Sequence, residues 1–106
     1  MVRMTTISPT DLAGLGAEAT IVDVREPDEF AQARVAGALN IPLGTLPTRL
    51  GDLPRDRPVY VMCLSGGRSA QATAYLVGHG VDAVNLEGGI TRWYQSGLPL
   101  ERGPAA

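Results

Sequence analysis

The segment CLSGGRS, residues 63–69, places a single thiol before two adjacent glycines and an arginine. The β-branched run at residues 59–62 predicts a strand that delivers Cys63, followed by a tight turn and a helix from Arg68. Backbone N–H groups of such a turn, together with the unpaired N–H groups at the helix start, form a cradle for an anion around the sulfur. Glycine provides the positive φ that this turn requires. The thiolate is favoured in a cradle of this kind, which predicts that Cys63 is a nucleophile at neutral pH.

Two neighbours in this segment have chemical roles of their own. Arg68 can give a charge-assisted, bidentate bond to an anionic substrate oxygen, and Ser69 can shape the entry to the helix. A lone cysteine at a strand end is more often an inert, small apolar residue. The glycine turn, the arginine and the helix that follows favour the reactive alternative.

Strand and helix patterns alternate along the chain and must position this thiol. We predict strands at 20–24, 38–41, 59–62 and 83–86, and helices from Ser8-Pro9, from Pro27, and at 45–53, 68–79 and 90–96. Alternation in so short a chain favours an α/β fold around a parallel sheet, whose ligands bind beyond the carboxyl ends of the strands. In the helix at 68–79, the spacing predicts a buried face made of Ala70, Thr73, Ala74 and Val77.

Composition limits the classes of function. The 106 residues are 44% apolar and 19% charged, which fits one domain over 1–106 with a core at about 5–100 and a loose tail at 101–106. A net charge of −2 disfavours nucleic acid and anionic membranes as partners. All nine basic residues are arginine, which excludes lysine Schiff-base chemistry. One cysteine excludes an internal disulfide and a multi-cysteine metal site, so we expect a reducing cytoplasm. The sequence predicts no extensive apolar surface, so we expect a monomer.

Four segments, taken together, resemble the rhodanese-like domains, and they span nearly the whole chain from Ser8 to Leu100. They are IVDVREPDEF (21–30), VAGALNIPL (35–43), VYVM with CLSGGRS (59–69), and NLEGGITRW (85–93). The resemblance implies an α/β fold with a central, mostly parallel five-stranded sheet and helices on both faces. It also implies sulfurtransferase activity, with Cys63 carrying a persulfide. The matching substrate-binding loop comprises Leu64, Ser65, Gly66, Gly67, Arg68 and Ser69.

The implied reaction moves a sulfane sulfur from thiosulfate or a persulfide to a thiol, or to cyanide, and needs no metal or organic cofactor. The donor or acceptor can be a small molecule or a protein. Leu64 and Ser65 are uncharged, so we expect a persulfide donor to be preferred over thiosulfate. Four residues separate Cys63 from Arg68, whereas related phosphatases and arsenate reductases use five, so the cradle is predicted to be too narrow for phosphate. The alternatives are a non-catalytic binding or regulatory module and a relay serving one protein partner.

Other polar and aromatic residues have structural interpretations. Asp23 and Arg25 are predicted to form ion pairs and loop hydrogen bonds that fix the fold. His79 ends a helix, where a cation complements the helix dipole. Glu87 is expected to be a solvated turn acid. The dipeptide Arg34-Val35 stands where relatives often have His-Ile, a change expected to affect packing or surface contacts. Three aromatic residues are expected in core or rim packing: Tyr75, Trp93 and Tyr94.

Overall fold

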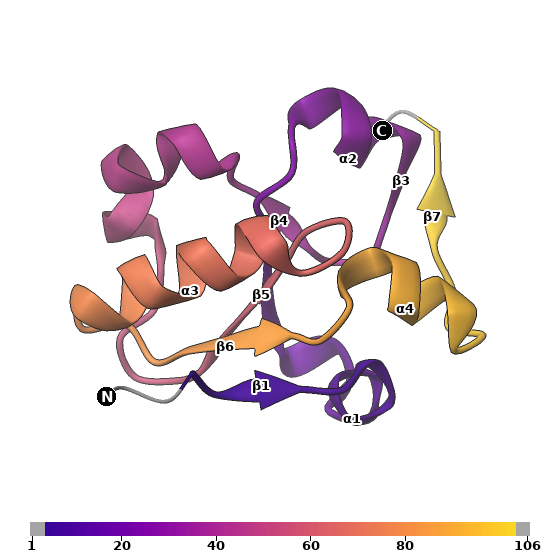
Figure 1. The fold of residues 1–106 in the computed structure, drawn as a ribbon, viewed down its shortest axis with the longest axis horizontal. Helices are drawn as coiled ribbons and strands as arrows, with labels where there is room; N and C mark the ends of the chain where they lie inside the picture. The colour runs from indigo at the N-terminus through magenta and orange to yellow at the C-terminus, as the bar shows by residue number, and fades with distance from the viewer. Residues whose placement is uncertain (1–3, 104–106) are drawn as a thin grey trace.

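The computed structural model describes residues 4–103, which fold as strands alternating with short helices (Figure 1). In chain order the elements are β1 (Thr6–Ile7), α1 (Pro9–Gly14), η1 (Gly16–Glu18), β2 (Thr20–Asp23), α2 (Pro27–Gln32), β3 (Ala33–Arg34), β4 (Leu39–Asn40), η2 (Leu43–Asp52), β5 (Val59–Met62), α3 (Gly67–Gly78), β6 (Ala83–Leu86), α4 (Gly89–Gln95) and β7 (Glu101–Arg102).

The main sheet has five strands in the order β1-β6-β5-β2-β4, and every neighbouring pair in it is parallel. β5 is the central strand, between β2 and β6. Its residues and those of β2 are mostly buried, as a β-branched run covered on both faces should be. The predicted α/β fold with a five-stranded parallel sheet is confirmed.

Helices cover both faces of this sheet. On one face, η2 and α3 close a core cluster that includes Leu46, Val61 and Leu76. On the other face, α1 and α4 close a second cluster that includes Leu12 and Trp93. Figure 1 shows α3 on one side of β6 and α1 on the other.

The buried face of α3 differs from the predicted one. Its buried residues are Ser69, Ala72, Thr73 and Leu76. Val77 is 44% exposed and Ala74 is also exposed, so this part of the prediction was wrong. Small hydroxyl residues can face the core because Thr73 Oγ1 donates to the Ser69 carbonyl at 2.7 Å, which satisfies its polar atom.

The segment predicted as a helix at 45–53 is the 3₁₀ helix η2, from Leu43 to Asp52. Pro47 lies inside it and has no N–H to donate to an α-helical ladder. Tighter 3₁₀ turns are a common solution for short connectors.

The expected loose tail differs at its beginning. Glu101 and Arg102 form β7, which pairs antiparallel with β3. Arg34 holds this contact by donating to the Gly103 carbonyl at 2.6 Å and by an ion pair with Glu101 at 3.5 Å. Arg34 therefore contributes packing and a surface contact, as predicted, and residues 104–106 lie outside the described part of the chain. Within residues 4–103, no helix is long and apolar enough to cross a membrane.

Candidate functional site

Cys63 follows the central strand directly, at the carboxyl end of the sheet, where the topology places ligand sites. The Cys63 loop, residues 63–69, turns at Gly66 and enters α3 at Gly67. Gly66 has φ of +111°, a conformation that side-chain-bearing residues rarely adopt. Gly67 is the first helical residue and has no positive φ, so one of the two glycines, not both, meets this requirement.

Backbone amides of the loop face the sulfur. The Gly66 N–H donates to Cys63 Sγ at 3.1 Å. Burial raises the pKa of the Cys63 thiol, but the Ser69 hydroxyl and the amides of Ser69, Gly66 and Ser65 lower the pKa by more. The net pKa is therefore below its ordinary value, and the bond from Gly66 is of the kind that the predicted cradle requires.

The sulfur lies at the closed end of this cradle. Cys63 is only 1% exposed and belongs to the core cluster on the α3 face of the sheet. Ser69, also buried, donates its hydroxyl to the Gly66 carbonyl at 3.2 Å and so closes the turn. The sulfur is therefore bounded by apolar side chains on one side and hydrogen-bond donors on the other.

Helix α4 supports the loop from its outer side. The Ile90 N–H donates to the Cys63 carbonyl at 2.9 Å, and the Thr91 N–H donates to the Leu64 carbonyl at 3.0 Å. Gly89 lies against the same carbonyls with φ of +61°, and a Cβ there would come within 2.5 Å of both oxygens. The amides at the start of α4 thus satisfy the loop carbonyls and leave the loop amides to the sulfur.

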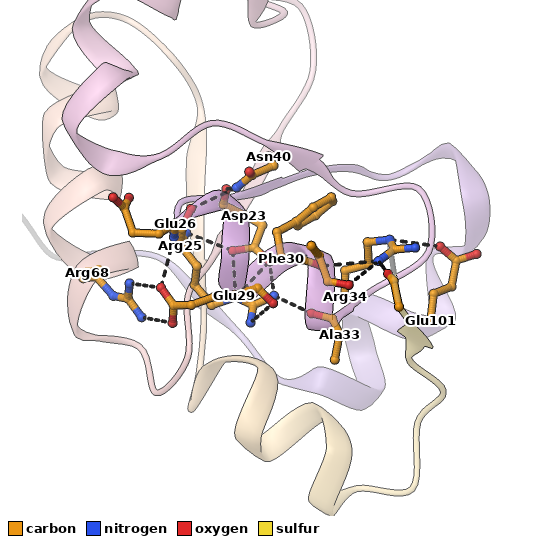
Figure 2. Close-up of polar contacts among 12 residues, drawn as sticks. Asp23, Arg25, Glu26, Glu29, Phe30, Ala33, Arg34, Asn40, Arg68 and Glu101 are labelled. Carbon is orange, nitrogen blue, oxygen red and sulfur yellow. Dashed lines mark hydrogen bonds and ion pairs between the residues drawn. The ribbon is translucent and has the colours of Figure 1, made fainter. Parts of the chain in front are cut away.

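Arg68 is held by Glu29 of α2, which sequence reasoning missed. The two side chains form a bidentate pair, with Arg68 Nη1 2.7 Å and Nη2 3.0 Å from the two carboxylate oxygens (Figure 2). The Arg68 hydrogen bond is the main cause that lowers the pKa of Glu29 from 4.5 to about 2, and the pairing raises the pKa of Arg68 in turn. The expected bond from Arg68 to a substrate oxygen stays a prediction, since its guanidinium is engaged here.

These features match one family of proteins. The family model for the rhodanese-like domain matches residues 8–96. The chain belongs to the rhodanese-like family. The Cys63 loop, residues 63–69, lies inside the matched range.

Relatives of this rhodanese-like chain agree with that assignment. A sulfurtransferase of Allochromatium vinosum is 46% identical over 76% of this chain and 76% of its own length. The crystal structure of a rhodanese-related protein of Thermoplasma volcanium has a TM-score of 0.87 at 36% identity, covering 92% of this chain and 97% of that one. A thiosulfate sulfurtransferase of Pseudomonas aeruginosa has a TM-score of 0.84 at 28% identity over 95% of this chain but 20% of its own. Relatives bearing the name sulfurtransferase place this domain in a sulfurtransferase family.

A second arginine pair lies behind the loop of the rhodanese-like domain. Arg25 Nη2 is 2.7 Å from Asp23 Oδ2, and it also donates to the Ala33 carbonyl at 2.8 Å. Asn40 donates to the carbonyls of Asp23 and Arg25 at 3.0 and 2.9 Å (Figure 2). The predicted structural role of Asp23 and Arg25 is confirmed, because their charged groups face each other and the backbone.

The other residues singled out in the sequence have structural contacts of their own. Trp93 is buried and donates its ring N–H to the Pro99 carbonyl, so its packing role is confirmed. Tyr94 is 60% exposed and lines a groove between α2, α4 and β7. His79 ends α3, with Nδ1 2.8 Å from the Tyr75 carbonyl. Glu87 is half-exposed and accepts the Thr6 hydroxyl at 2.8 Å.

Sequence reasoning overlooked Glu29 and the packing role of Gly89. A signal for Glu29 was available, because it lies three residues after Glu26 at the start of α2 and accepts the Glu26 N–H at 3.0 Å. That signal predicts a helix cap and gives no hint of Arg68. Among residues 4–103, no group of three or more His, Cys, Asp or Glu side chains could hold a metal ion.

Proposed function

We propose that this domain transfers sulfane sulfur through a persulfide on Cys63, with thiosulfate or an organic persulfide as donor and a thiol as acceptor. The observation that carries the proposal is the Gly66 N–H pointing at Sγ, at 3.1 Å, within a loop that lowers the pKa of the thiol. Amide and hydroxyl donors that favour a thiolate also suit the anionic terminal sulfur of a persulfide.

In the first step, the Cys63 thiolate attacks the outer sulfur of the donor. A bond forms between Sγ and that sulfur, and the bond from the outer sulfur to the rest of the donor breaks. Its electron pair leaves with sulfite when the donor is thiosulfate, or with a thiolate when the donor is a persulfide. The product Cys63–S–S⁻ carries one negative charge, as the attacking thiolate did.

In the second step, an acceptor thiolate attacks the terminal sulfur of Cys63–S–S⁻. The new persulfide leaves, and the electron pair of the broken bond restores the Cys63 thiolate. Cyanide reacts in the same way and leaves as thiocyanate. Both steps are nucleophilic displacements at a sulfur atom. The hydrogen-bond donors of the loop stabilise the negative charge on sulfur in each step.

The size and closure of the cradle favour sulfur over a tetrahedral oxyanion. Four residues separate Cys63 from Arg68, and Arg68 is occupied by Glu29. With Cys63 only 1% exposed, the loop must yield locally before a donor reaches Sγ. A single terminal sulfur atom requires a smaller displacement of the loop than a phosphate group with its oxygen atoms.

Intact-protein mass spectrometry tests the proposal, since Cys63 is the sole cysteine of the chain. Incubation with thiosulfate or glutathione persulfide should add the mass of one sulfur atom, and a later excess of thiol should remove it. Cys63→Ser should gain nothing, and Ser65→Ala, which keeps the backbone amide, should still take up sulfur. Failure of the wild type with every donor would overturn the proposal and favour a non-catalytic module.

A further inference from the structure

The Cys63 loop is fixed to the rest of the domain unequally along its length. At its beginning, the Cys63 carbonyl accepts the Ile90 N–H at 2.9 Å and the Leu64 carbonyl accepts the Thr91 N–H at 3.0 Å. Gly89 packs so closely on the same carbonyls that a Cβ there would lie 2.5 Å from both oxygens. Because these contacts join backbone to backbone, no side-chain rotation can release them. Residues 63 and 64 are therefore the rigid half of the loop.

The half that follows has a single hydrogen-bonded contact with a different element. Ser65 and Gly67 are exposed, and within residues 4–103 neither is hydrogen-bonded to another strand or helix. Gly66 bonds only to its own loop and to α3, since its N–H lies on Sγ and its carbonyl accepts the Ala70 N–H at 3.0 Å. The remaining residue is Arg68, whose guanidinium is bound by a carboxylate of α2. Movement of the loop should therefore be confined to residues 65–68.

We propose that Glu29 is a positioning residue for Cys63, and that its ion pair with Arg68 is a latch that controls access to the thiol. Closed, the latch holds residues 65–68 over the sulfur, where Cys63 is 1% exposed. Open, it lets a reagent or a sulfur donor reach Sγ. Figure 2 shows the two side chains facing each other between α2 and the start of α3. The biological role of the latch rests on the proposed function, because it concerns the same thiol.

The contacts of the latch allow it both to form and to release. Its carboxylate is oriented before it meets Arg68, because Glu29 Oε1 also accepts the Glu26 N–H at 3.0 Å. The Arg68 and Glu29 side chains are 36% and 30% exposed, so water can replace either partner. Breaking an exposed pair of this kind changes an equilibrium by about 1.5- to 5-fold, and salt screens the attraction. The pair can therefore open without unfolding of the domain.

The experiment measures the rate at which iodoacetamide, a neutral reagent, alkylates Cys63 in the full chain. Cys63 is the sole cysteine, so the mass of the intact protein reports on this site alone. Rates are compared at the pH plateau, where the thiol is fully ionised, so that a shifted pKa does not change the ionised fraction. Glu29→Gln should raise the plateau rate by about 2- to 5-fold, because its amide oxygen can still accept the Glu26 N–H while the charge that holds Arg68 is lost. Arg68→Gln breaks the latch from the other side and should raise the rate likewise.

Asp28→Asn is the matched control, since Asp28 is an exposed acid of the same helix and has no ion pair within residues 4–103. It should leave the plateau rate unchanged. Salt gives an independent check, because about 1 M sodium chloride should raise the wild-type rate toward that of Glu29→Gln and leave the variant unaffected.

Three results would overturn the inference. They are a Glu29→Gln rate equal to or below that of the wild type, an equal rise in Asp28→Asn, and a salt effect of the same size in the wild type and in Glu29→Gln. Alkylation does not require sulfur transfer, so absence of sulfur uptake from every donor would overturn the proposed function and leave the access measurement intact.

Discussion

Two arginine–carboxylate pairs take their carboxylates from the segment DVREPDEF, residues 23–30, and they differ in burial and in the sequence distance between partners. The Asp23–Arg25 pair is 0% and 5% exposed and joins residues two apart in sequence. The Glu29–Arg68 pair is 30% and 36% exposed and joins α2 to the Cys63 loop across 39 positions. The first pair also bonds to the backbone at Ala33, and the second ties α2 to the Cys63 loop.

The two pairs should contribute differently to stability because water reaches only one of them. A buried charge that loses its partner has neither water nor an opposite charge to stabilise it, so the protein depends on the intact pair. A charge that is about one-third exposed and loses its partner is hydrated instead, so the free energy of unfolding changes little. Substitution of Glu29 or Arg68 should therefore change the charge beside the Cys63 loop with only a small loss of stability.

Asp23→Asn should give the largest effect. Arg25 would remain buried without a carboxylate, and the free energy of unfolding should fall by about 3–5 kcal/mol in urea denaturation. Asp52→Asn, which breaks the exposed pair with Arg49, is the control and should change stability by less than about 1 kcal/mol. Equal losses in the two variants would remove the distinction between buried and exposed pairs.

Ser69→Ala tests whether neutral donors, more than the engaged Arg68, hold the thiolate. Removing this hydroxyl should raise the pKa of Cys63, because the hydroxyl is one of the groups that lower it. The pH profile of alkylation of the sole thiol should shift to higher pH accordingly. Ser96→Ala, which removes a hydroxyl bonded to the Arg92 carbonyl, should leave the profile in place. An unshifted profile in Ser69→Ala would mean that the amides alone suffice.

Glu29→Gln should lower the free energy of unfolding by only about 0.2–1 kcal/mol. A double-mutant cycle with Arg68→Gln measures the same coupling, and a value of several kcal/mol would show that this pair behaves as a buried one. The freed Arg68 charge should also raise kcat/KM for thiosulfate relative to glutathione persulfide. Unchanged relative kcat/KM values would contradict a role for this pair in donor choice.

The smallest expected effect is the pH dependence of the stability that the Glu29–Arg68 pair contributes. The pKa of Glu29 is lowered from 4.5 to about 2 in the folded protein, so its stabilisation is complete above 4.5 and is lost as pH falls toward 2. The stability difference between wild type and Glu29→Gln should shrink in this window, measured by denaturation at both ends. A difference independent of pH would show that the carboxylate charge contributes nothing.

Local signals predicted the elements well wherever a helix cap or an apolar run of about four residues marks them. Ser8 caps α1 by accepting the Asp11 N–H at 3.2 Å, with Pro9 as the first helical residue, as the sequence indicated. The strands predicted at 59–62 and 83–86 coincide with β5 and β6. β1, β3 and β7 are two residues each and were missed, because two residues are too few to show an apolar or β-branched run.

The sequence alone determined where the thiol lies and how its cradle forms. The strand end, the positive φ at Gly66 and the start of α3 all lie within the seven residues of the loop, so local geometry decides them. Only the tertiary structure decided which carboxylate engages Arg68 and which cation faces the groove. β2 and β5 are parallel neighbours, with Asp23 opposite Met62, which brings the α2 that follows one strand against the loop that follows the other. The pairing of β7 with β3 sets Arg102 in the same region, and no local interaction could specify either approach.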